Sequence, residues 1–325
     1  MSNATKMQLD ELERLMSRMP RELCCTTLLP EFGVRWRDMA KAIRSARMSM
    51  TSASIARIIC RKVAKNLPAL TVDEILAKLK LQMVAIQSRI WHVINLQEPL
   101  TEPWEPDELP ERLADALTTA RIGKNKSPEV QTVQIGDLVF VSVQLKSEVR
   151  CSAPLYLAMP LGLPVALVSS VKSNGVLQAC VVGLGYKTFS DANLNGRHIP
   201  SLLRIHGGWD ENLGYMTEIP KYSPVPVITK TGIDYTNKAY DEHYVNTILG
   251  PDPPLLTDLH INTAKKFFNK VDDRIITIKA HLSSQDIAKT LKTLVSKGAL
   301  RPTSELLHVL HTAKSNRLEN YTESD

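Results

Sequence analysis

The chain has 325 residues, of which 43% are hydrophobic, and it carries 40 lysines and arginines against 34 acidic residues. This length and apolar content suffice for two packed domains and exclude a chain that is disordered throughout. No apolar run approaches the roughly 20 residues that span a bilayer. The N-terminal MSNATKMQLDELERL contains acids that are atypical of a targeting peptide. We therefore expect a soluble protein of the cytosol or nucleus, without a membrane partner.

The positive charge is concentrated in one part of the chain. Residues 1–97 hold 16 basic and 8 acidic side chains, whereas residues 98–325 hold 24 and 26. The five cysteines are scattered and contain no C-x-x-C pair, which indicates reduced thiols and neither a disulfide framework nor a zinc site. A polyanion would therefore bind preferentially to the N-terminal third.

The first 97 residues show the period of short amphipathic helices. Apolar residues from Leu9 to Met19 predict a first helix that ends before Pro20, and its outer face carries Asp10, Arg14 and Arg18. A short helix over 21–29 follows. Further helices are expected over 35–65, from an N-cap at Thr71, and through 86–94. These elements predict a compact antiparallel helix bundle over residues 1–97.

The most basic stretch runs from Arg35 to Lys65. It contains nine lysines or arginines and one acid, Asp38, and its apolar residues recur at helical spacing on both sides of a break at 48–54, where TSAS offers an N-cap. A solvated helix face normally mixes both signs of charge. Two explanations remain open: an inert basic surface, or a surface that binds phosphate, since clustered cations neutralise a nucleic-acid backbone. The stretch includes Lys41, Arg44 and Arg47.

A change of composition marks the end of the bundle. Prolines alternate with acids through QEPLTEPWEPDELPE, which predicts a semi-rigid linker over residues 98–108. A helix is then expected to about residue 121, followed by two strands that turn at Gly136 and Asp137. LYLAM, VALVSSV, GVLQACVVGL, VPVIT and RIITIKAHL are interpreted as strands, and HIPSLLRIHG and QDIAKTLKTLVSKG as helices, the second of which Gly298 is expected to close. Residues 109–325 are thus predicted to form a mainly antiparallel α+β sheet domain.

Neither a catalytic constellation nor a cofactor motif emerges from the sequence. Gly183 and Gly185 are spaced like the start of a dinucleotide fingerprint, but Thr188 replaces the third glycine and the pair is expected to end a strand. Nucleophile, base and orienting group are not found together. We expect a non-enzymatic protein without cofactor or metal.

Basic residues of the predicted sheet domain lie near expected strand ends. Loops at one end of a sheet converge, so these cations either line a groove that follows duplex DNA or are ordinary loop residues. Aromatic residues make up only 5% of the chain, which argues against base stacking. The residues are Arg121, Lys124, Lys126, Lys172, Lys187 and Arg197.

Several motifs follow one another in an order that is informative as a set. The first domain contains SRMPREL, the basic IRSAR and IWHVI, and the sheet domain contains SSVKSNGVLQA and NGRHIPSLLRI. The C-terminal quarter contains VNTILGPDPPLLTDLHINTAKKFFNK and IITIKAHLSSQDIAKTLKTLVSKGALRPTSELLHVL. This ordered set resembles the centromere protein N (CENP-N) family over nearly the whole chain, and the C-terminal quarter is most similar.

This resemblance implies a pyrin-like (death-fold) bundle joined to a sheet domain, in a non-enzymatic subunit of the inner kinetochore at the centromere in the nucleus. The family binds nucleosomal DNA with both domains, pairs with CENP-L through its C-terminal part and associates with other inner-kinetochore subunits. Arg14, Arg18, Arg44 and Arg47 match basic positions of its first domain.

Two further groups of positions bear on what the family binds. Lys172 and Arg197 match positions in its DNA-binding groove, where Ser173 replaces a second cation. Asp10 matches an acid that meets histone arginines, but Lys6 stands where another acid is expected, so selectivity for the histone variant CENP-A stays open. The alternative is a death-fold adaptor whose charged helices bind another bundle.

Overall fold

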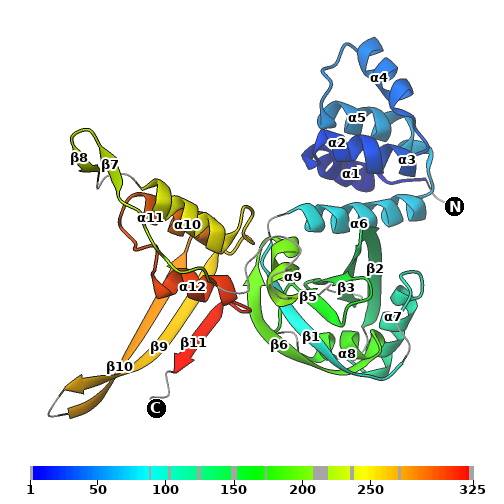
Figure 1. Ribbon diagram of the computed structural model, residues 1–325. Coiled ribbons are helices and arrows are strands. Elements are labelled where there is room, and N and C mark those ends of the chain that lie inside the picture. Colours follow the sequence, from blue (N-terminus) through cyan, green and yellow to red (C-terminus); the bar gives the residue numbers. More distant parts are fainter. Residues whose placement is uncertain are drawn as a thin grey trace. The chain divides into compact units, whose positions relative to one another are not determined.

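The computed structural model describes residues 3–87, 89–101, 104–122, 126–147, 152–172, 174–207, 219–234, 238–269 and 272–321 (Figure 1). Helices at the N-terminus precede a mainly antiparallel sheet domain with flanking helices, which confirms the predicted α+β class. The chain forms two compact units, Met1–Gln87 with Pro103–Leu161 and Ser88–Glu102 with Gly162–Asp325. Among the described residues, no helix has the length and apolar content needed to cross a membrane.

The helical part of the first unit is built around a central helix. Its helices are α1 (Lys6–Arg18), α2 (Arg21–Leu23), the π-helical turn η1 (Cys24–Leu28), α3 (Leu29–Glu31), α4 (Trp36–Ser45), α5 (Ser52–Lys62), the 3-10 turn η2 (Ala64–Asn66) and α6 (Ala69–Ile86). Ile55 and Ile59 of α5 are fully buried, together with Leu12 and Met16 of α1. Burying each such side chain contributes roughly 1.5–3 kcal/mol. The predicted bundle is therefore present, with α5 inside it.

Two predictions at the end of the bundle are wrong. Helix α6 begins at Ala69 after Pro68, whose side chain makes no cap, so Thr71 lies inside the helix. Pro68 is the N-cap residue, and its φ of −57° and ψ of 145° are compatible with the non-helical conformation of that position. The helix predicted through 86–94 is instead strand β1 (Trp91–Pro99). Val93 and Ile94 are both buried because β1 is a central strand whose two faces are covered, and consecutive apolar residues then mimic a helical pattern.

The first unit continues with a helix and a three-stranded meander. α7 (Leu109–Thr119) precedes β2 (Ser127–Ile135), β3 (Leu138–Lys146) and β4 (Leu155–Pro160), which pair in that order and are antiparallel. The predicted turn is confirmed, since Ile135 pairs with Leu138 and Gly136 adopts φ +60°. A positive φ suits glycine because it has no Cβ.

In the second unit, β1 lies between β5 (Val165–Val168) and β6 (Tyr186–Gly196), and it is antiparallel to both. The predicted linker over 98–108 thus begins inside β1, where Leu100 N also donates to Gly185 O at 2.7 Å. GVLQACVVGL, predicted as a strand, lies in helix α8 (Asn174–Gly183). Leu177, Cys180 and Val181 are buried while Val182 is 45% exposed, which is helical spacing.

The remainder of the second unit contains a hairpin, helices and a separate sheet. The elements are α9 (Ile199–Gly207), β7 (Val227–Thr229), β8 (Gly232–Asp234), α10 (Ala239–Leu249), β9 (Asp258–Asn269), β10 (Asp272–Ser283), α11 (Ile287–Ser296), α12 (Glu305–Thr312) and β11 (Arg317–Tyr321). The sheet has the order β10-β9-β11, with β11 parallel to β9. The predicted helices α9 and α11 and the predicted strands in β7 and β10 are confirmed. Gly298 adopts φ +70° just after α11, as its predicted role of closing that helix requires.

Candidate nucleic-acid interface

Helix α4 presents a row of cations along one face. Arg37, Lys41 and Arg44 are four and three residues apart and exposed, whereas Met39 and Ile43 on the other side are buried. Such spacing aligns side chains because an α-helix has 3.6 residues per turn. The row spans about 10 Å at 1.5 Å per residue, a length of duplex that carries about six phosphate charges.

The turn after α4 extends this row by one residue. Arg47 adopts φ +52°, in the left-handed region, and Met48 N donates to Ile43 O at 3.2 Å. A left-handed residue with this hydrogen bond is a common helix ending, usually supplied by glycine. Arginine there costs roughly 1–2 kcal/mol of backbone strain. We call Arg37, Lys41, Arg44 and Arg47 the α4 basic surface.

In the part of the chain that the structure describes, no carboxylate lies within ion-pair distance of the α4 basic surface. Asp38, the acid of α4, contacts Arg35 instead, at 3.2 Å. Other acids of the bundle are also paired with other cations: Glu13 with Arg57 at 3.6 Å, Glu31 with Lys78 at 3.6 Å and Glu11 with Lys80 at 2.9 Å. These exposed pairs contribute only about 0–1 kcal/mol each, and each of them holds its acid against a cation outside the α4 basic surface.

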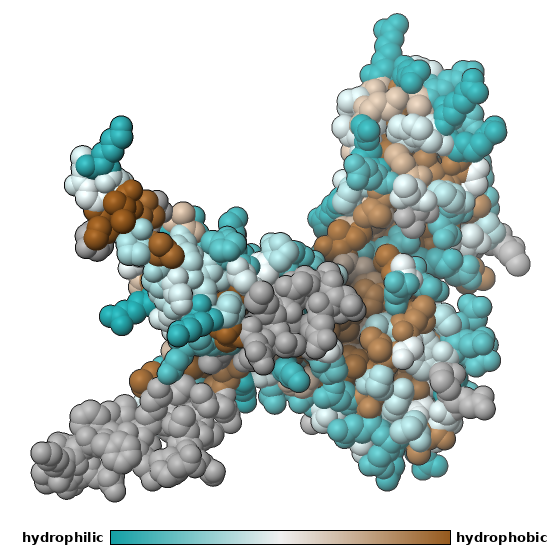
Figure 2. Space-filling view, in the orientation of Figure 1, coloured by the Kyte–Doolittle hydropathy of each residue, from teal (hydrophilic) through white to brown (hydrophobic). Residues whose placement is uncertain are grey.

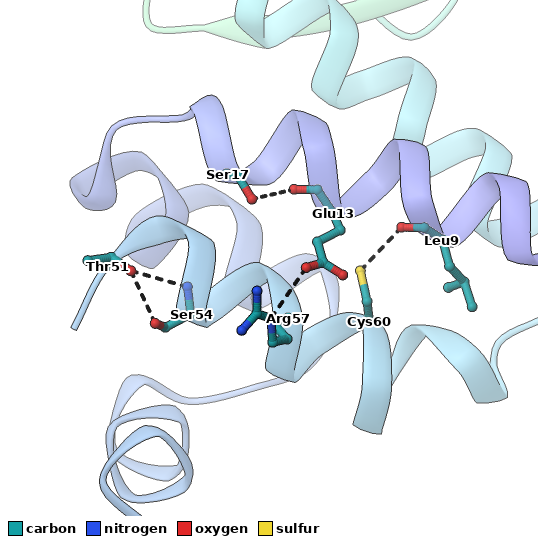
Figure 3. A network of polar contacts seen from close by, with 7 residues as sticks. All are labelled: Leu9, Glu13, Ser17, Thr51, Ser54, Arg57 and Cys60. Atoms are coloured by element: carbon teal, nitrogen blue, oxygen red, sulfur yellow. Dashed lines mark hydrogen bonds and ion pairs between the residues drawn. The ribbon is translucent and has the colours of Figure 1, made fainter. Parts of the chain in front are cut away.

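Helix α5 also has exposed cations, of which Arg57 has an ion-pair partner and Arg61 and Lys62 have none among the described residues. Figure 3 shows Glu13 of α1 reaching Arg57 of α5, next to the contact between the Cys60 thiol and the Leu9 carbonyl oxygen, 3.6 Å apart. Thr51 caps α5, because its hydroxyl oxygen accepts from Ser54 N at 3.3 Å. The predicted cap is confirmed, and the basic stretch is divided into two helices, of which α5 is the more deeply buried. In Figure 2, hydrophilic side chains gather at the end of the bundle that holds α4 in Figure 1.

The predicted cations of α1 form a second, smaller basic site. Arg14 and Arg18 are exposed one turn apart, on the side of α1 that faces away from Leu12 and Met16. Asp10 is exposed one turn before Arg14 on the same helix. The three residues therefore have the accessibility that binding requires.

The structure separates the predicted cations of the sheet domain. Arg121 and Lys126 are exposed between α7 and β2 of the first unit, and Lys124 lies outside the described residues. Lys172, Lys187 and Arg197 belong to the second unit. That all six line one groove stays a prediction.

Within the second unit, the sheet register brings two of these cations to one end. Val168, the last residue of β5, pairs with His92 of β1, and Gly196, the last residue of β6, pairs with Trp91. Strands β5 and β6 therefore end on either side of the start of β1, about 10 Å apart across two strand spacings. Lys172 and Arg197 follow these two ends and are exposed.

Lys187 lies at the opposite end of β6 and already has an ion-pair partner. Its ammonium group is 2.7 Å from Glu98 of β1. The hydrogen bond and the charge of that carboxylate raise the pKa of Lys187 above its usual value. A cation that already has a carboxylate partner attracts phosphate less, so Lys187 is the weakest member of the predicted set.

Two residues were not singled out from the sequence as members of the site. Arg37 belongs to the α4 basic surface, and its helical spacing to Lys41 and Arg44 would have been enough to predict that it lies on the same face. Arg89 precedes Trp91 and so lies at the same end of the sheet as Lys172 and Arg197. The sequence signal for Arg89 was hidden because β1 was expected to be a helix.

The described residues contain no group of three or more histidines, cysteines or acids that would hold a metal ion. The cysteines of the described part are also poor nucleophiles. Burial raises the pKa of the Cys60 thiol to about 12, with the charges of Glu13 and Asp10 acting in the same direction. Burial likewise raises the pKa of Cys180 to about 12. These thiols stay protonated at neutral pH, and the thiolate is the reactive form.

No protein-family model matches the chain, and none of the curated proteins has a significantly similar sequence. The functional argument therefore depends on the residues and their geometry.

Proposed function

We propose that this protein is a non-enzymatic scaffold of the inner kinetochore that binds nucleosomal DNA at the centromere, in the nucleus. The observation that carries the proposal is the α4 basic surface, whose four exposed cations have no carboxylate partner among the described residues. Clustered cations bind a phosphate backbone by releasing its counterions, and this attraction does not depend on base sequence.

The cations available for DNA belong to both units. Arg14 and Arg18 of α1 add to the α4 basic surface in the first unit, with Arg121 and Lys126 near β2. In the second unit, Lys172 and Arg197 share one end of the β5-β1-β6 sheet. Arginine suits this role because its planar guanidinium makes two hydrogen bonds to one phosphate.

The same ion pairs weaken the alternative of a death-fold adaptor. Bundles that pair through charge need an acidic face on one partner and a basic face on the other. Glu11, Glu13 and Glu31 are each bonded to a lysine or arginine of the same chain. Self-association through these three acids would have to break their pairs, whereas DNA supplies its own negative charge.

For the C-terminal part we propose pairing with CENP-L, which the family resemblance suggests. In the order β10-β9-β11, the outer strands β10 and β11 each keep one edge without a partner strand in the described sheet. Free edges pair readily with a strand of another protein. On α1, exposed Asp10 is the candidate contact for histone arginines.

The experiment is a salt series of binding to reconstituted nucleosomes and to free duplex DNA, with and without CENP-L. We expect salt-sensitive binding that is tighter to nucleosomes and strengthened by CENP-L. Nucleosomes with CENP-A or ordinary histone H3 then measure selectivity. Absence of binding at low salt contradicts the proposal and favours the adaptor.

A further inference from the structure

The segment between α4 and α5 contains one exposed hydroxyl without a hydrogen-bond partner among the described residues, that of Ser49. The hydroxyls of Ser45 and Thr51, on either side, already make hydrogen bonds. Ser45 Oγ donates to Ala42 O at 2.9 Å, and Thr51 Oγ1 lies 3.1 Å from Ser54 Oγ at the cap of α5 (Figure 3). Ser52 is half-buried within the first turn of α5. Ser49 is thus the accessible hydroxyl of this segment.

The backbone around Ser49 is held in a shape that presents it outward. Met48 and Met50, on either side, are partly buried against the hydrophobic core of the bundle. Residues 48 and 49 belong to neither a helix nor a strand, and Thr51 N donates to Ser49 O at 2.9 Å. A kinase active site must take its substrate in a non-helical conformation, and this segment already has one between two anchored side chains.

The charges around Ser49 match a particular class of enzyme. Arg47 precedes it by two residues and Arg44 by five, and both are exposed. Kinases with an acidic substrate groove select serines that follow arginines at such positions, because carboxylates of the groove bond to guanidinium groups. The arginines that we assign to DNA therefore also mark Ser49 as a substrate.

We propose that Ser49 is a phosphorylation site for a basophilic protein kinase, and that its phosphate switches off the α4 basic surface; this inference rests on the proposed DNA binding. In the transfer, Ser49 Oγ forms a bond to the γ-phosphorus of ATP while the bond from that phosphorus to the β–γ bridging oxygen breaks. ADP leaves with that oxygen, and the hydroxyl proton passes to the base of the kinase.

The switch follows from charge and distance. A phosphoserine carries about −1.5 to −2 at neutral pH, which offsets roughly half of the four positive charges of the surface. Two residues separate Cα atoms by at most about 7 Å, so the phosphate reaches Arg47 and bonds to it in place of DNA. Loss of two phosphate contacts makes the fall of log K with log salt shallower, by about 1.8 units of slope.

The test uses the full-length protein, a purified kinase that selects arginine two residues before serine, and ATP. Mass spectrometry locates the phosphate, and a labelled duplex titrated between 50 and 200 mM salt measures affinity. We expect Ser49 to be modified and DNA affinity to fall by about tenfold or more, with a shallower salt slope. Ser49→Ala should keep full affinity after the same treatment.

A matched control separates a local effect from a change of net charge. Ser223 is also exposed and lies outside helices and strands, but it belongs to the second unit, in the segment that precedes β7. Ser49→Glu should weaken DNA binding more than Ser223→Glu, although each adds one negative charge. Equal effects would overturn a local switch.

Two further outcomes would contradict the inference. A protein phosphorylated at Ser49 that binds DNA as tightly as before refutes the switch, and a kinase that modifies other serines but leaves Ser49 untouched refutes the site. If the unmodified protein fails to bind DNA at low salt, the proposed function fails, and the regulatory role of Ser49 fails with it. Mass spectrometry still decides whether Ser49 is a kinase substrate in that case.

Discussion

Helices α4 and α5 come from the same basic stretch of sequence and take different parts in the bundle. α5 buries six of its eleven residues, whereas α4 buries three of ten. Arg57 of α5 is paired with Glu13, while the cations of the α4 basic surface, like the exposed Arg61 and Lys62 at the end of α5, have no carboxylate partner in the described part of the chain. A count of positive residues therefore overstates the interface: what matters is which cations remain exposed and unpaired once the helices pack.

The largest expected effect tests the core role of α5. Ile59→Ala removes a fully buried side chain and should lower the free energy of unfolding by about 2–5 kcal/mol, since the transfer and cavity costs add. Lys41→Ala on α4 should change it by less than about 0.5 kcal/mol. Urea denaturation of both variants measures the difference. Equal destabilisation would remove the distinction between the two helices.

The next prediction tests the binding role of α4. Arg44→Ala with Arg47→Ala should weaken DNA binding by about tenfold or more, at all sequences alike, and flatten the salt slope by roughly one unit per lost phosphate contact. The control is Lys78→Ala with Lys80→Ala, which removes the same charge from lysines that are already paired with Glu31 and Glu11. Unchanged affinity of the arginine variant would exclude these residues from the interface.

One substitution of Arg47 should have opposite effects on stability and on DNA binding. Because its φ is +52°, Arg47→Gly relieves backbone strain and should stabilise the protein by up to about 1 kcal/mol. The same change removes a cation and should weaken DNA binding by a few-fold. Thermal unfolding and the duplex titration measure the two effects. A variant that is more stable and binds DNA equally well would show that Arg47 makes no phosphate contact.

The smallest effect concerns the ion pair between Arg57 of α5 and Glu13. Glu13→Gln leaves Arg57 without its carboxylate and should change stability by only about 0–1 kcal/mol. DNA affinity should rise about two- to threefold at low salt, because the bundle loses one negative charge. Fluorescence anisotropy at 50 mM salt is sensitive enough to detect this. If Glu13→Gln raised DNA affinity by a larger factor than the Arg44 and Arg47 substitutions lower it, the main DNA contact would lie on α5.

Local signals explain which elements were predictable. The apolar spacing in α4 and α5, the Thr51 cap, the turn at Gly136 and the end of α11 near Gly298 depend on nearby residues, and the structure confirms them. Strand β1 was missed because a strand covered on both faces has consecutive apolar residues such as Val93 and Ile94. The sequence of α8 had the helical period but was interpreted as a strand.

The sequence by itself determined the α+β class, the excess of positive charge in the first third and most cations of the α4 basic surface, because periodicity and composition are local properties of a chain. Tertiary structure alone decided which of these cations stay unpaired. Glu13 meets Arg57, and Glu98 meets Lys187, across long stretches of chain, and Lys172 and Arg197 share one sheet end only through the register with β1. Such meetings depend on packing and strand register, which bring together residues that no short stretch of sequence connects.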